Sequence, residues 1–117
     1  MAESNFRSLV AYQAARSLAR NAHASVRHWG KFDQWTVGVQ LVRAADSIGA
    51  NIAKAMGRFH LADQRRLLLF ARGSLYETEH WIQCAAERGL LDAGEFEAAL
   101  SEAARTLSGL ITKRHAA

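Results

Sequence analysis

Apolar residues recur every three or four positions along most of this chain, which is the spacing that places side chains on one face of a helix. The first such stretch predicts a helix of about 25 residues, with Ser4 as its N-cap and Gly30 as a left-handed stop. Its apolar positions are Phe6, Val10, Ala14, Leu18, Ala22, Val26 and Trp29.

A second helix is predicted from a cap at Asp33 to about Phe59, with Trp35 and Val37 entering the core at its start. One apolar stripe follows, made of Leu41, Ala45, Ile48, Ile52, Ala55 and Phe59. The opposite side combines polar Arg43, Ser47, Lys54 and Arg58 with small Gly49, Ala50, Ala53 and Gly57. We interpret the small residues as a smooth face where another backbone approaches closely.

The third helix follows a link at residues 60–62 and carries more apolar surface than one core face requires. Its core row is Leu61, Leu68, Ala71, Leu75 and Ile82. Leu69 and Tyr76 project from one flank of that row, and Phe70 and Trp81 from the other. Exposing large apolar side chains forgoes about 1.5 to 3 kcal/mol each, which predicts a contact between subunits. The alternative is that this wide stripe wraps into its own bundle. The predicted subunit interface is Gly49, Ala53, Gly57, Leu69, Phe70, Tyr76 and Trp81.

Gly89 is expected to end the third helix, and Asp92 with Glu95 to form a reciprocal cap for a fourth. Phe96, Leu100, Ala103, Leu107 and Leu110 mark that helix. Four helices of similar length with short links predict an all-α, antiparallel, up-down-up-down four-helix bundle. We expect residues 1–117 to form this single domain.

Composition narrows the class of protein. The 117 residues are 50% hydrophobic and 22% charged, which is typical of a folded globular domain. Cys84 is the only cysteine, so it has no partner for an internal disulfide. No secretory leader and no membrane-spanning run are recognised, which favours a cytoplasmic location and no membrane partner.

Charge is distributed unevenly along the chain. Residues 1–72 hold 11 Lys or Arg against 4 Asp or Glu, whereas residues 73–117 hold 4 against 7. This asymmetry predicts a cationic surface that holds phosphates with little base specificity. The candidate nucleic-acid-binding residues are Arg43, Lys54, Arg58, Arg65 and Arg66, with Arg72 beside them. The alternative is that Arg43 or Arg58 pairs with Glu77 or Glu79 inside an assembly while the others are merely solvated.

We find no catalytic set, no metal site and no cofactor motif. Glu77 and His80 have the Glu-x-x-His spacing of metal ligands in helical bundles, but no other helix supplies the remaining carboxylates. Cys84 lacks an adjacent base in the sequence, and Ser74 lacks the strand-turn-helix setting of a hydrolase nucleophile. These residue types therefore argue against an enzyme.

Several short motifs resemble one bacterial family. They are Arg43-Ala44-Ala45, Ser47-Ile48, Asn51-Ile52-Ala53, Gly57-Arg58, Ala71, Gly73-Ser74-Leu75 and Glu77, with Leu9, Tyr12, Gln13 and Ala14 in the first helix. Their order is similar to that in the four-helix-bundle proteins named after 23S rRNA intervening sequences. Lys54 and Ala55 depart from the Glu and Gly that are common in that family.

The resemblance implies a homo-oligomeric, usually pentameric, ring of bundles without an established enzymatic activity. A related branch, the accessory variability proteins of diversity-generating retroelements, binds nucleic acid and a reverse transcriptase through a basic surface. We therefore expect a non-enzymatic oligomeric scaffold that contacts RNA or DNA. The alternative is a protein-protein interaction module without nucleic-acid affinity.

Overall fold

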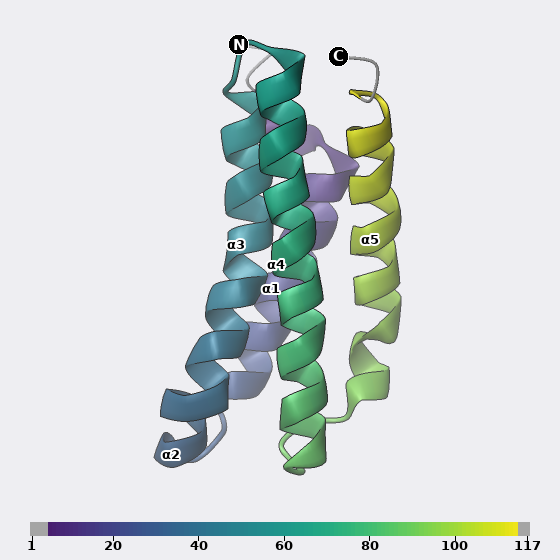
Figure 1. The fold of residues 1–117 in the computed structure, drawn as a ribbon. Helices are drawn as coiled ribbons and strands as arrows, with labels where there is room; N and C mark the ends of the chain where they lie inside the picture. Colours follow the sequence, from purple (N-terminus) through teal and green to yellow (C-terminus); the bar gives the residue numbers. More distant parts are fainter. Residues whose placement is uncertain (1–4, 115–117) are drawn as a thin grey trace.

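Four long helices build the protein, and the computed structural model describes residues 5–114 of it. They are α1 (Val10–Val26), α3 (Val39–Met56), α4 (Leu61–Glu87) and α5 (Glu97–Thr112). Figure 1 shows these helices side by side, with successive long helices joined at alternate ends of the bundle. No strand occurs among residues 5–114, so the predicted all-α four-helix class is confirmed.

Short helical segments form the corners of the bundle. A 3-10 turn, η2 (Phe6–Ser8), precedes α1, and another, η4 (Ala93–Phe96), leads into α5. Between α1 and α3 the chain passes through α2 (Lys31–Asp33) and a π-helical segment, η3 (Gln34–Gly38). None of the helices among the described residues has both the length and the apolar character needed to cross a bilayer.

The core lies along the centre of a rod that measures 44 × 22 × 20 Å. The predicted stripe of α3 is confirmed here, since Leu41, Ile48 and Ile52 are fully buried. Helix α3 packs against both α1 and α4, and α5 closes the bundle against the same two helices. The other large, fully buried residues include Leu18, Leu68, Ile82 and Leu107.

The apolar pattern fails near the ends of the helices. Trp35 and Phe59 were expected in the core but are 73% and 90% exposed, and Leu61 and Val10 are exposed as well. Trp35 lies in the π-helical segment, where the wider turn shifts the helical phase. Of the two residues predicted to enter the core at the start of this helix, only Val37 is buried. Phe59 follows the end of α3 at Met56, so the phase of the helix no longer applies to it.

Several predicted helix boundaries also need correction. Helix α1 has 17 residues instead of about 25, because it ends at Val26 with Arg27 as its C-cap. Gly30 has an extended conformation (φ −65°, ψ 160°) and precedes α2 as its N-cap, so it is not a left-handed stop. The Asp33 side chain makes no capping hydrogen bond. The predicted cap at Ser4 lies outside the described residues.

Predictions for the boundary between α4 and α5 hold better. Gly89 adopts φ 73° just after Arg88, the C-cap of α4, as expected for a left-handed stop. Asp92 caps the next turn, because its Oδ1 accepts a hydrogen bond from the Gly94 N–H at 2.9 Å. The return bond expected from the Glu95 side chain is absent among the described hydrogen bonds, so the cap is not reciprocal.

Gly38 brings the start of the second long helix close to α1. A Cβ at this position would lie 2.8 Å from Cγ1 of Val26 and 3.0 Å from the carbonyl oxygen of Asp33. Only a residue without a side chain allows this approach. The position of Gly38 therefore helps to fix how α3 lies against α1.

Candidate nucleic-acid interface

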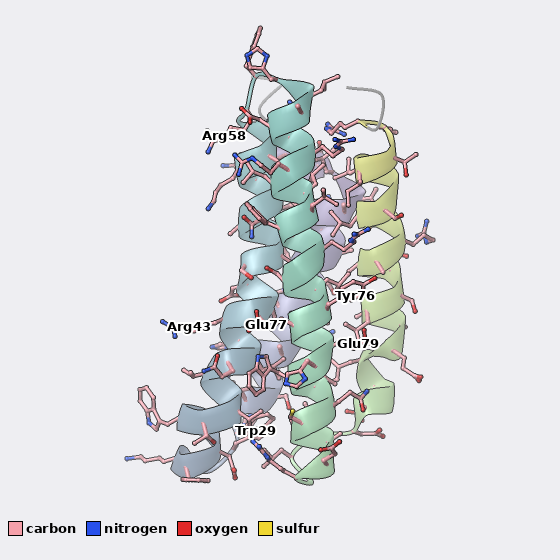
Figure 2. The ribbon with its side chains drawn as sticks, in the orientation of Figure 1. Trp29, Arg43, Arg58, Tyr76, Glu77 and Glu79 are labelled. Carbon is pink, nitrogen blue, oxygen red and sulfur yellow. The ribbon has the colours of Figure 1, made fainter. Side chains whose placement is uncertain are left out.

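Three of the predicted cationic residues form a row along the outer side of α3. Arg43, Lys54 and Arg58 are all exposed, and Arg58 lies just after the end of the helix. At 1.5 Å per residue, Arg43 and Lys54 are about 16 Å apart along the axis. Figure 2 shows Arg43 and Arg58 on the same side of the bundle, well separated along its length. The arrangement is an extended row and not a pocket.

The row is not neutralised within one chain. Arg66 pairs with Asp63 at 3.8 Å and Arg105 pairs with Glu102 at 2.6 Å, and within residues 5–114 neither Arg43 nor Arg58 pairs with Glu77 or Glu79. The alternative is that Arg43 or Arg58 pairs with Glu77 or Glu79 of a neighbouring subunit. The positive charge of the row is therefore directed to solvent in the single chain.

Arg65 and Arg66 lie on different sides of α4, although they are neighbours in the sequence. They are about 100° apart around α4, and Arg65 is half-buried whereas Arg66 is exposed. The Arg66 guanidinium lies 5.7 Å from the centre of the Phe70 ring and 3.8 Å from Asp63. Its charge is thus partly compensated before any ligand binds.

A second group of cations lies on α1, which the sequence analysis did not single out. A hollow of about 450 Å³ is lined by Arg16, Ala19, Arg20, His23 and Asp46, and only Asp46 comes from α3. A neighbouring hollow of about 230 Å³ is also lined by Arg16 and Arg20. We call the two together the α1–α3 groove. The second hollow is completed by Arg7, Tyr12 and Gln13.

A sequence signal for this groove exists. Arg16, Arg20 and His23 have the i, i+4, i+7 spacing that places side chains on one helix face. The spacing alone does not show that Asp46 and Gly49 of α3 lie beside them. That juxtaposition depends on how α1 packs against α3.

The predicted subunit-interface residues of α4 are mostly accessible. Phe70 is 53% exposed and Tyr76 is 64% exposed, and Leu69 is exposed as well. Trp81 is only half-buried and packs against the core, while its Nε1 donates a hydrogen bond to Glu77 Oε2 at 3.1 Å. The single chain therefore leaves the predicted interface residues Leu69, Phe70 and Tyr76 in contact with water.

The small residues of α3 divide into two kinds. Gly49 is buried by its own chain, since a Cβ there would meet Cδ of Arg16 and Cε1 of Tyr12, each at 3.4 Å. The prediction that Gly49 faces another subunit does not fit this position, because α1 already covers it. Ala53 is half-buried and Gly57 is exposed.

His80 and the polar side chains around it on α4 contact residues of the same helix. His80 Nε2 lies 3.6 Å from Sγ of Cys84, and the His80 ring packs edge-on against Trp81. Within residues 5–114, no three His, Cys, Asp or Glu side chains converge in a way that would hold a metal ion. Glu77 accepts a hydrogen bond from Trp81, and both Glu77 and His80 are exposed.

Comparison with known proteins supports the resemblance noted in the sequence. A search of curated proteins found no match. The family model described as 23S rRNA-intervening sequence protein matches residues 7–113, which covers all four long helices. The chain therefore belongs to the family of 23S rRNA-intervening sequence proteins.

Proposed function

We propose that this protein is a non-enzymatic homo-oligomeric scaffold whose basic surface binds RNA or DNA with little base specificity. The observation that carries this proposal is the exposed row of Arg43, Lys54 and Arg58, which has no ion pair within residues 5–114. Cations that stay solvated can exchange their counterions for phosphates, and this exchange drives non-specific binding. Contacts of this kind position a nucleic acid without reading its bases.

Self-association is supported by the exposed apolar residues of α4. Leu69 and Tyr76 lie on one flank of the helix, seven residues apart, and Phe70 lies on the other flank. Two different apolar flanks favour a contact in which one flank of a subunit packs against the other flank of the next subunit. Contacts of that head-to-tail type close into rings, and the resemblance to the family implies a ring of five.

A second candidate function is recognition of a protein partner. Phe32 and Trp35 are strongly exposed at the corner between α1 and α3. Beside Trp35 is a mostly apolar hollow of about 220 Å³, which is also lined by Val39 and Val42. Exposed aromatic residues next to an apolar hollow are typical of protein interfaces. This candidate does not require affinity for nucleic acid.

A titration against salt tests the proposed nucleic-acid binding. A fluorescein-labelled RNA of mixed sequence and a DNA of the same sequence are titrated with the full chain while their anisotropy is recorded. The logarithm of the binding constant should fall linearly with the logarithm of salt concentration. No binding at about 50 mM salt, or binding that salt leaves unchanged, would contradict phosphate contact.

Light scattering on the same preparation tests self-association. The measured mass should be a multiple of the 12.9 kDa chain mass and should stay constant on dilution through the micromolar range. A mass of 12.9 kDa throughout that range would contradict the oligomeric part of the proposal while leaving nucleic-acid binding open to the titration.

A further inference from the structure

The cationic side chains of α1 that line the α1–α3 groove are regularly spaced along the helix. Arg16, Arg20 and His23 follow one another at axial rises of about 6 Å and about 4.5 Å along one face of α1. Arg16 and Arg20 line both hollows, so the two hollows adjoin at these residues. Together the hollows extend from Arg7 in η2 to His23 in α1, with Arg16 and Arg20 in the part that they share.

Packing of α1 against α3 positions the first of these cations. Cδ of Arg16 would lie 3.4 Å from a Cβ at Gly49, so the aliphatic part of Arg16 rests over the α3 backbone. Arg16 is half-buried by this contact but still lines the groove. A guanidinium whose stem is held by packing loses less freedom when it forms hydrogen bonds.

The groove has an excess of positive charge. Asp46 is the only acidic residue among those lining it, and Asp46 forms no ion pair with Arg16 or Arg20. The fixed cations of the groove are all arginines, whose planar fork matches two phosphate oxygens at once. Tyr12 and Gln13 also line it and add polar atoms.

We propose that the α1–α3 groove binds the phosphodiester backbone of a single RNA or DNA strand, with Arg16 and Arg20 contacting phosphates. This inference rests on the proposed nucleic-acid function and places a contact on α1, apart from the row on α3. An elongated cationic groove tracks a strand whose charges repeat at regular intervals. An acidic peptide, whose charges repeat less regularly, matches the spacing of Arg16 and Arg20 less well.

The test compares the full-length protein with variants that carry matched changes of charge. Arg16→Gln with Arg20→Gln removes two charges from the groove. Arg88→Gln with Arg105→Gln removes two exposed charges, one just after α4 and one on α5, and neither residue lines the groove. Each protein is titrated into labelled oligouridylate and oligothymidylate of about 20 nucleotides, long enough to span one groove site. Circular dichroism checks that each variant is folded.

The groove variant should bind about tenfold more weakly or worse, and its salt slope should fall by about 1.4, the value for two lost single-strand contacts. The control variant should stay within about twofold of the wild type, because screening limits the effect of remote charges. RNA and DNA should be affected equally, since the proposed contact is to the phosphates that they share.

Two further variants keep the test decisive if Arg16→Gln disturbs folding. Arg20→Glu changes only an exposed residue and should weaken binding by itself. Asp46→Asn removes the only acid of the groove and should strengthen binding by about threefold, a gain that damage to the fold would not produce.

The possible results separate this inference from the proposed function. If the wild type does not bind either oligonucleotide, the groove assignment is overturned, and the mixed-sequence titration decides whether the proposed function is overturned as well. If the wild type binds but the groove variant behaves like the control, the groove assignment is wrong while nucleic-acid binding stands. If poly-glutamate displaces the RNA as effectively as unlabelled RNA at equal charge, the groove recognises carboxylates and the phosphodiester assignment is overturned.

Discussion

Arg114 donates a hydrogen bond from Nε to Oε1 of Gln64 at 2.7 Å and so joins the end of α5 to the start of α4. The same guanidinium donates to the Leu110 carbonyl oxygen at 2.9 Å and lies 3.8 Å from Sδ of Met56 in α3. Partial burial lowers the pKa of Arg114 from its ordinary value through desolvation. One side chain therefore contacts three helices at one end of the bundle.

Replacing Arg114 by Ala should lower the free energy of unfolding by about 1 to 2 kcal/mol, because two hydrogen bonds to a charged donor are lost. Arg105→Ala is the matched control. Arg105 pairs with Glu102 on the exposed surface of α5, so its loss should cost less than about 0.5 kcal/mol. Urea denaturation at one fixed protein concentration measures both changes. Equal effects of the two substitutions would contradict a special role for Arg114.

Two glycine substitutions should have opposite effects on stability. Gly38→Ala should lower the free energy of unfolding by about 1 to 3 kcal/mol, because its Cβ would collide with Val26 and a backbone carbonyl. Gly73→Ala, in the exposed middle of α4 with no atom within 4 Å of the added Cβ, should raise it by about 0.5 to 1 kcal/mol. Thermal unfolding followed by circular dichroism compares them. A stabilising Gly38→Ala would show that α1 and η3 are not held this close.

Charge on α4 should break up the proposed assembly. Phe70→Asp with Tyr76→Asp places an acid on each exposed flank, so buried contacts between subunits would become unpaired charges. We expect the mass from light scattering to fall to that of one chain. Phe59→Asp is the control, because Phe59 is even more exposed but lies beyond the end of α3. Loss of the assembly in Phe59→Asp alone would place the subunit contact at the end of the bundle.

Reversing charge along α3 should weaken nucleic-acid binding without changing sequence preference. Arg43→Glu with Lys54→Glu removes two cations that project to solvent, so the salt slope should fall by about 1.4 for a single strand. The loss should be equal for oligonucleotides of different sequence, as is typical of phosphate contacts. Arg88→Glu with Arg105→Glu serves as the control. Unchanged binding by the α3 variant would leave the α1–α3 groove as the main contact.

The helices and their buried faces were predictable from the chain because helical periodicity is a local property. Leu41, Ile48 and Ile52 recur at the spacing of one helix face, and all three are buried. Gly89 was predictable as a helix stop because the left-handed conformation after a helix depends on local backbone geometry. It depends little on how the helices pack. The same periodicity failed at Trp35, where a π-helical turn shifted the phase.

The candidate site was only half predictable. The exposed row of Arg43, Lys54 and Arg58 follows from the angles within one helix. The groove does not, because it requires Arg16 to meet Gly49, a residue 33 positions further along the chain. Amino-acid order determined which residues share a helix face. Only the packing of α1 on α3 decided that Gly49 contacts α1 of the same chain and that the arginines of α1 line a groove.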